Sequence, residues 1–86
     1  MAQRDKLLFD ILNNANDVRF DDACKVAEWL GFSWSSGKGA HRAYSRAGEM
    51  EQLNFQDRGG KIKPYQAKQL QRMIGRYWDF ELGGPR

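Results

Sequence analysis

The spacing of the apolar residues changes from a helical period to a strand period at Gly31. Before this glycine, apolar side chains recur at intervals of three and four residues, as one face of a helix requires. These residues are Phe20, Ala23, Cys24, Ala27 and Leu30. After the glycine, Phe32 and Trp34 alternate with serines, which is typical of a half-buried strand. Because glycine also commonly follows the last turn of a helix, the chain is expected to contain both helices and a sheet.

The other elements follow from the same periodicities and from the turn-forming residues between them. Helices are predicted over 6–12, from 20 or 21 to 30, and from Pro64 onwards. Strands are predicted over 32–35, 41–45 and 50–55, with a flexible turn at 36–39, a hairpin connection at 46–48 and a basic loop at 56–63. Proline fits the first turn of a helix, where its missing N–H costs nothing. The final helix is expected to bury one stripe, made of Ala67, Leu70, Ile74 and Tyr77.

This order of elements predicts an α+β fold, a small two-layer sandwich with a three-stranded antiparallel sheet and its helices on one face. Without the short first helix, the order α-β-β-β-α is that of the double-stranded-RNA-binding fold. We expect a short N-terminal helix and turn over 1–17, the domain proper over 18–78 and a loose tail over 79–86.

Length and composition limit the class of protein. A chain of 86 residues suits one small domain, and 41% hydrophobic residues suffice for a core. The single cysteine, Cys24, excludes an internal disulfide and lies on a stripe expected to be buried. No segment resembles a signal peptide, and the longest apolar run is far shorter than the roughly 20 residues of a membrane span. A cytoplasmic location without a membrane partner is therefore expected.

The net charge of +3 is unevenly distributed along the chain. Residues 1–30 carry four basic and six acidic side chains, whereas residues 31–78 carry nine basic and three acidic ones. A basic segment of this kind favours polyanions, because cations that neutralise phosphates release counterions. An ordinary solvated basic surface accounts for the same pattern.

His41 is the only histidine, and it follows the Gly37-Lys38-Gly39 segment closely. Histidine exchanges protons near neutral pH, and Lys38 and Arg42 stand close to it in sequence. A histidine between two basic residues can bind a phosphate and transfer a proton next to it. The competing interpretation is an exposed strand histidine next to glycines that only form a hairpin turn.

Several segments, in their order and spacing, resemble the HicA family of toxins. They are 19–22, 30–32, 39–41, 53–56 and 63–69, and the likeness covers roughly residues 7–78. The most specific parts are the Gly-x-His step ending at His41 and the Lys-Pro-Tyr-Gln-x-Lys-Gln start of the last helix. Two departures stand out, since Ala40 replaces the usual serine and Arg42 occupies a position where many members carry a second histidine.

The resemblance implies an endoribonuclease, an mRNA interferase on a double-stranded-RNA-binding-like fold, that a HicB-type antitoxin neutralises. It implies that His41 is catalytic. We expect the RNA phosphates to be bound by basic and glycine residues, namely Lys38, Gly39, Arg42, Lys61, Lys63, Lys68 and Arg72. No metal or other cofactor is expected. The free toxin is expected to be a monomer and to form a hetero-oligomer with its antitoxin.

Metal-free RNA cleavage needs two proton transfers, and one histidine supplies only one of them. Water, Tyr44 or a lysine is the candidate for the other. Two further functions compete with the ribonuclease: a module that binds RNA without cutting it, and an interaction domain whose basic face docks an acidic antitoxin.

Overall fold

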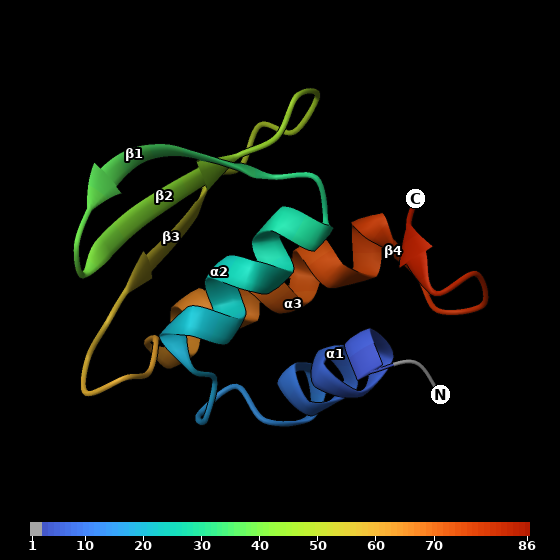
Figure 1. The fold of residues 1–86 in the computed structure, drawn as a ribbon, viewed down its shortest axis with the longest axis horizontal. Coiled ribbons are helices and arrows are strands. Elements are labelled where there is room, and N and C mark those ends of the chain that lie inside the picture. The colour runs from blue at the N-terminus through green and yellow to red at the C-terminus, as the bar shows by residue number, and fades with distance from the viewer. Residues whose placement is uncertain (1–2) are drawn as a thin grey trace.

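The computed structural model describes residues 3–86 and shows a sheet covered on one face by helices (Figure 1). The helices are α1 (Gln3–Asn13), α2 (Phe20–Trp29) and α3 (Pro64–Tyr77). The main strands are β1 (Ser33–Lys38), β2 (His41–Ser45) and β3 (Leu53–Gln56), and a short pair follows, β4 (Trp78–Asp79) and β5 (Gly84–Pro85).

The main sheet is antiparallel with the order β1-β2-β3, so each strand pairs with its neighbour in the chain. In Figure 1, α2 and α3 lie against one face of this sheet, and α1 lies farther from it, beside α3. The predicted α+β fold, with three antiparallel strands and the helices on one face, is confirmed.

The core lies between the sheet and the helices. Because side chains alternate along a strand, every second residue of β2 and β3 points into this core. Tyr44 from β2 and Leu53 and Phe55 from β3 are fully buried. The predicted α3 stripe is confirmed for Ala67, Leu70 and Ile74, which are fully buried, while Tyr77 is half-buried. Cys24 is buried as expected, and it remains a free thiol.

The first strand differs from its prediction. We expected a half-buried strand over 32–35 and a turn at 36–39, but β1 continues to Lys38 and all six of its residues are exposed. The pairing register shifts between Trp34 and Ser36, which marks a bulge. The Trp34 indole N–H donates to the carbonyl oxygens of Ser36 and Gly37, at 2.9 and 3.0 Å, and so holds the tryptophan along the strand. The turn is the two-residue Gly39–Ala40 pair.

The third strand begins at Leu53 rather than at residue 50, because the segment before it is bound to α3. The Glu49 carboxylate accepts hydrogen bonds from the Tyr77 hydroxyl at 2.5 Å and from Arg76 at 2.9 Å, and it also accepts one from the backbone N–H of Glu51 at 2.9 Å. These contacts hold residues 49–51 against α3, so this segment does not pair with β2. The Met50 side chain is fully exposed.

The N-terminal helix and the C-terminal segment pack on each other. The buried Trp78 indole N–H donates to the Asp5 carboxylate at 2.9 Å, and Gln71 on α3 donates to the Ile11 carbonyl at 2.8 Å. The phenyl rings of Phe9 and Phe80 stack with centroids 4.6 Å apart. The prediction of a loose tail after Trp78 is wrong, since β4 and β5 form a small hairpin there. Helix α1 therefore belongs to the same core as the rest of the domain.

No helix within residues 3–86 combines the length and the apolar character that crossing a bilayer requires.

The contact between Asp5 and Trp78 predicts that α1 stabilises the whole domain. Replacing Asp5 with alanine leaves a buried indole N–H without an acceptor, which costs about 1–3 kcal/mol of unfolding free energy. Urea unfolding of Asp5→Ala measures this loss. Asp10→Ala, an exposed position on the same helix, is the control and should unfold like the wild type. Equal stabilities of the two variants would show that α1 is not anchored through this bond.

The Glu49 contacts predict a pH-dependent stability. The Tyr77 hydroxyl, together with the Glu51 N–H and the Arg76 guanidinium, lowers the pKa of Glu49 from 4.5 to about 2. A group whose pKa is lower in the folded state stabilises the fold above the unfolded pKa, and this stabilisation is lost as the pH falls toward 2. Tyr77→Phe removes the largest contribution. Its stability deficit relative to the wild type should therefore be greatest above about pH 4.5 and should narrow on acidification.

Urea unfolding at a series of pH values measures this deficit. Tyr65→Phe also removes one hydroxyl, but Tyr65 is exposed on α3, so its deficit should stay near zero at every pH. A Tyr77→Phe deficit that does not change with pH would refute the role of the hydroxyl.

Candidate functional site

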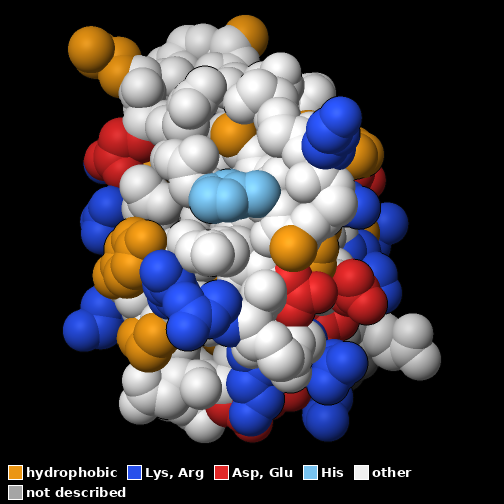
Figure 2. All heavy atoms as spheres, turned by 90° about the vertical axis from the view of Figure 1, so that its left-hand side faces the viewer, with side chains coloured by type: hydrophobic (Ala, Val, Ile, Leu, Met, Phe, Trp, Pro, Cys, Tyr) orange, Lys and Arg blue, Asp and Glu red, His pale blue; other side chains and the backbone are white. Residues whose placement is uncertain are grey.

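His41 lies at the end of the sheet, as the first residue of β2 and directly after the turn. It pairs with Lys38 on β1 and with Gln56 on β3, so the three residues form a row across the sheet. Successive side chains of a strand point to opposite faces. Because Tyr44 points into the core, His41 faces away from the helices, and it is exposed. Figure 2 shows the histidine near the middle of this end of the molecule, with both basic and acidic side chains on the surface around it.

Gly37 allows β1 to approach His41 closely. Its φ of +84° lies in the left-handed region, and a Cβ atom there would stand 2.4 Å from the His41 carbonyl oxygen. Gly39 occupies the first position of the two-residue turn with a φ of +64°, where a Cβ atom would meet nothing within 4 Å. The turn is also tied to the chain beyond β3, because the Asp57 N–H donates to the Ala40 carbonyl at 2.8 Å. The backbone around His41 is therefore tightly constrained.

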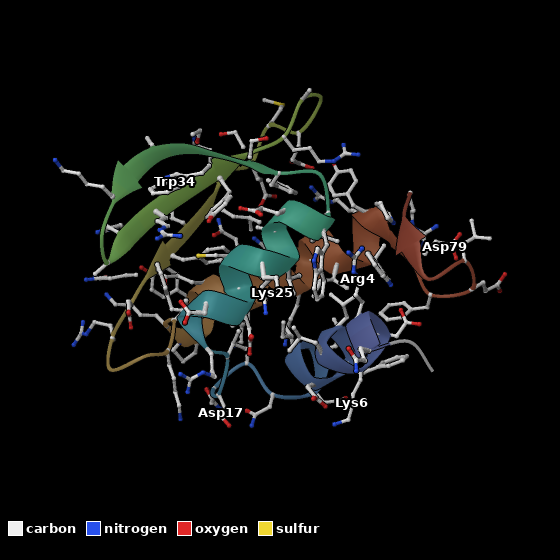
Figure 3. All side chains as sticks on the ribbon, in the orientation of Figure 1. Arg4, Lys6, Asp17, Lys25, Trp34 and Asp79 are labelled. Atoms are coloured by element: carbon white, nitrogen blue, oxygen red, sulfur yellow. The ribbon has the colours of Figure 1, made fainter. Side chains whose placement is uncertain are left out.

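Arg42 lies on the opposite face of β2 from His41, although the two are adjacent in sequence. Its guanidinium carbon lies 4.3 Å from the ring centroid of Trp34 and 5.5 Å from that of Phe20. Figure 3 shows Trp34 at the sheet. The Arg42 Nε is buried without a hydrogen-bond partner, and the guanidinium forms no ion pair with a carboxylate of residues 3–86. Arg42 thus packs between aromatic rings and does not flank His41 in space.

The Tyr44 hydroxyl is buried beside Arg42 and Cys24. Burial raises the pKa of Tyr44 to about 12, and burial likewise raises the pKa of the Cys24 thiol. Because Tyr44 lies on the face of the sheet opposite His41 and is fully buried, its hydroxyl cannot reach a phosphate held beside the histidine. Of the candidates for the second proton carrier, water and lysine remain.

The predicted phosphate-binding residues fall into two groups. Lys61 forms an ion pair with Asp17 at 2.7 Å, and Arg72 forms one with Glu51 at 3.1 Å, so carboxylates already neutralise both cations. Within residues 3–86, Lys38, Lys63 and Lys68 have no carboxylate within ion-pair distance. Among the predicted phosphate-binding residues, the lysines without a carboxylate partner are therefore those of the hairpin end and of the start of α3.

A buried amide joins these two places. The Gln66 side-chain oxygen accepts hydrogen bonds from the backbone N–H groups of Gln56, at 3.1 Å, and of Lys63, at 3.2 Å. Gln66 is only 2% exposed. Because Gln56 is the strand partner of His41, this amide holds the start of α3 at the same end of the molecule as the histidine. We did not predict this role from the sequence, although a glutamine at the third position of a helix is a known capping signal.

A separate cleft of about 650 Å³ lies on another side of the molecule, between α1, the α1–α2 connection and Lys61. Its lining includes Asp10, Asp17, Asp22 and Arg19 but not His41. Figure 3 shows Asp17 on the far side of α2 from Trp34. Its lining combines three carboxylates with Arg19 and Lys61, and it does not include His41, so we do not place the candidate catalytic site there. No group of three or more His, Cys, Asp and Glu side chains within residues 3–86 is placed to hold a metal ion.

A scan of protein-family models, a search of curated proteins and a search of solved structures each found no match to this chain. The resemblance to HicA toxins consequently rests on the residues quoted above.

The geometry of the hairpin predicts different roles for its two glycines. Gly39→Ala places a side chain in the left-handed region in open space and should cost about 1–2 kcal/mol. Gly37→Ala adds a clash with the His41 carbonyl and should cost clearly more. It should also shift the amide resonances of His41 and Arg42. Urea unfolding and amide NMR spectra of both variants measure these effects, and equal costs would show that the close approach at Gly37 is unimportant.

Proposed function

We propose that this protein is a toxin of a type II toxin–antitoxin system, an endoribonuclease that cleaves mRNA without a metal ion. The observation that supports it most directly is the position of His41. The histidine is exposed on the helix-free face of the sheet, beside Lys38 and directly after the Gly39–Ala40 turn. An accessible proton-transfer group next to an uncompensated cation is what phosphodiester cleavage needs.

The reaction can be written with this chain's own residues. The ribose 2′-oxygen loses its proton and bonds to phosphorus, the bond from phosphorus to the 5′-oxygen breaks, and the 5′-oxygen gains a proton. The products are a 2′,3′-cyclic phosphate and a 5′-hydroxyl. His41 would accept the first proton or donate the second, and such a group typically accelerates a reaction about 10²- to 10⁴-fold. Water or a lysine would complete the other transfer.

Cations near His41 would stabilise the negative charge that grows on the phosphoryl oxygens. Lys38 is its direct cross-strand neighbour, and Lys63 and Lys68 lie at the same end of the molecule, without carboxylate partners among residues 3–86. Lys61 and Arg72 would first have to exchange Asp17 and Glu51 for phosphates. Exposed ion pairs contribute only about 0–1 kcal/mol, so this exchange is inexpensive. Arg42 and Gly39 would act mainly by holding the hairpin in shape.

A HicB-type antitoxin is the partner that this function requires. A protein that covers the row of Lys38, His41 and Gln56 would block the proton transfer and the approach of phosphate together. The complex would be a hetero-oligomer, and the free toxin a monomer acting on mRNA in the cytoplasm.

Replacing His41 with alanine should lower the rate of RNA cleavage about 10²- to 10⁴-fold and leave the fold intact, because the side chain is exposed. The measurement uses purified protein, labelled mRNA and a metal chelator, with circular dichroism to check folding. The matched control is Asn54→Ala, an exposed residue on β3, which should cleave like the wild type.

Equal cleavage by His41→Ala and the wild type would overturn the assignment. Absence of cleavage by both, with RNA binding that weakens as salt rises, would indicate a module that binds RNA without cutting it. Expression in cells gives an independent readout. The wild type should arrest growth, His41→Ala should not, and co-expression of a HicB-type antitoxin should restore growth.

A further inference from the structure

Tyr65 is a large aromatic residue that the fold leaves in solvent. It is the second residue of α3 and is 64% exposed. The Lys63 amine lies 5.9 Å from its ring centroid, and Lys68 is exposed one turn further along the helix. The first turn of α3 contains no acidic residue. An aromatic ring between uncompensated cations is the combination that binds single-stranded nucleic acid.

The other exposed apolar side chains differ from Tyr65 in their contacts or their position. Phe9 stacks on Phe80, and Trp34 both bonds its own strand and packs on Arg42. Met50 and Leu82 are highly exposed, but they lie in the connection before β3 and in the turn between β4 and β5. Tyr65 is therefore the exposed aromatic residue that stands beside the uncompensated lysines of α3.

Tyr65 lies at the same end of the molecule as His41. The neighbouring residue, Gln66, accepts the hydrogen bond from the Gln56 N–H, and Gln56 is the strand partner of His41. Figure 1 shows the end of β3, the start of α3 and the β1–β2 turn on the same side. An RNA strand that crosses the row containing His41 can thus continue over the first turns of α3.

We propose that Tyr65 stacks on an unpaired RNA base while Lys63 and Lys68 contact the flanking phosphates, so that this surface selects single-stranded RNA. Every base presents a flat face, so such stacking tolerates any sequence. The bases of a duplex are already stacked on each other and are not available to the ring. This inference rests on the proposed ribonuclease function and names the form of RNA that the site would take.

The test measures binding apart from cleavage. A fluorescein-labelled 2′-O-methyl oligouridine lacks the 2′-hydroxyl that attacks phosphorus, so fluorescence anisotropy reports its binding alone. Tyr65→Ala should weaken this binding about 5- to 150-fold without changing the dependence on salt, because tyrosine is uncharged. Lys63→Gln and Lys68→Gln should each reduce the slope of log affinity against log salt by about 0.7. Tyr65→Phe keeps the ring and should bind like the wild type.

Two controls separate stacking from other effects. Met50→Ala removes a fully exposed apolar side chain from the connection before β3 and should leave binding unchanged. A duplex of the same chemistry should bind Tyr65→Ala and the wild type equally. Wild-type affinity of Tyr65→Ala for oligouridine would overturn the proposal, and so would an equal loss for single strand and duplex.

The outcomes also distinguish this inference from the proposed function. If Tyr65→Ala loses binding but the wild type cleaves no RNA, the binding surface stands and the ribonuclease proposal fails. If cleavage depends on His41 while Tyr65→Ala binds normally, the ribonuclease stands and this surface fails. No binding of RNA by the wild type would contradict both.

Discussion

The Gln66 side-chain amide is the contact on which the candidate site depends. It is almost completely buried and accepts hydrogen bonds from the last residue of β3 and from the residue before α3. A buried acceptor of this kind is costly to leave unpaired, so the two hydrogen bonds hold the start of α3 against the end of β3. Through Gln56 it also fixes the distance between α3 and the row that contains His41. One polar contact thereby brings the histidine and the lysines of α3 to one end of the molecule.

Strand alternation then divides the chemistry between two faces of the sheet. Lys38, His41 and Gln56 face away from the helices, whereas Tyr44 and Arg42 face toward them. The outward residues stay accessible to a polyanion, and the inward ones build the core that keeps the hairpin in place. Gly37 completes this arrangement, because a side chain there would collide with the His41 backbone. At the opposite end of the sheet, Glu49 binds α3 through the Tyr77 hydroxyl and the Arg76 guanidinium.

The sequence predicted the elements that depend on local periodicity. The change from helix to strand at Gly31, three of the four residues of the α3 stripe and the proline at its start are found in the structure. The first strand is longer and more exposed than expected because of a local bulge, whereas two other failures involve contacts between distant residues. The Glu49–Tyr77 bond spans 28 residues and delays β3, and the Trp78–Asp5 bond spans 73 residues and makes α1 part of the core. Arg42 was expected to lie beside His41 because the two residues are adjacent in the chain, but its guanidinium packs against Trp34 and Phe20 on the other face of the sheet. Alternation along β2, applied to both neighbours, would have separated Arg42 from His41.

The most direct test of the proposed RNA-binding surface is to measure whether RNA binds the protein and, if so, at which residues. Amide NMR spectra of ¹⁵N-labelled protein, recorded during titration with 2′-O-methyl oligouridine, report the binding surface residue by residue. The largest shifts are expected at Lys38, His41 and Gln56 and over 63–68. Shifts confined to the α1–α2 cleft or to the Glu49 region, with these residues unaffected, would contradict the proposed surface.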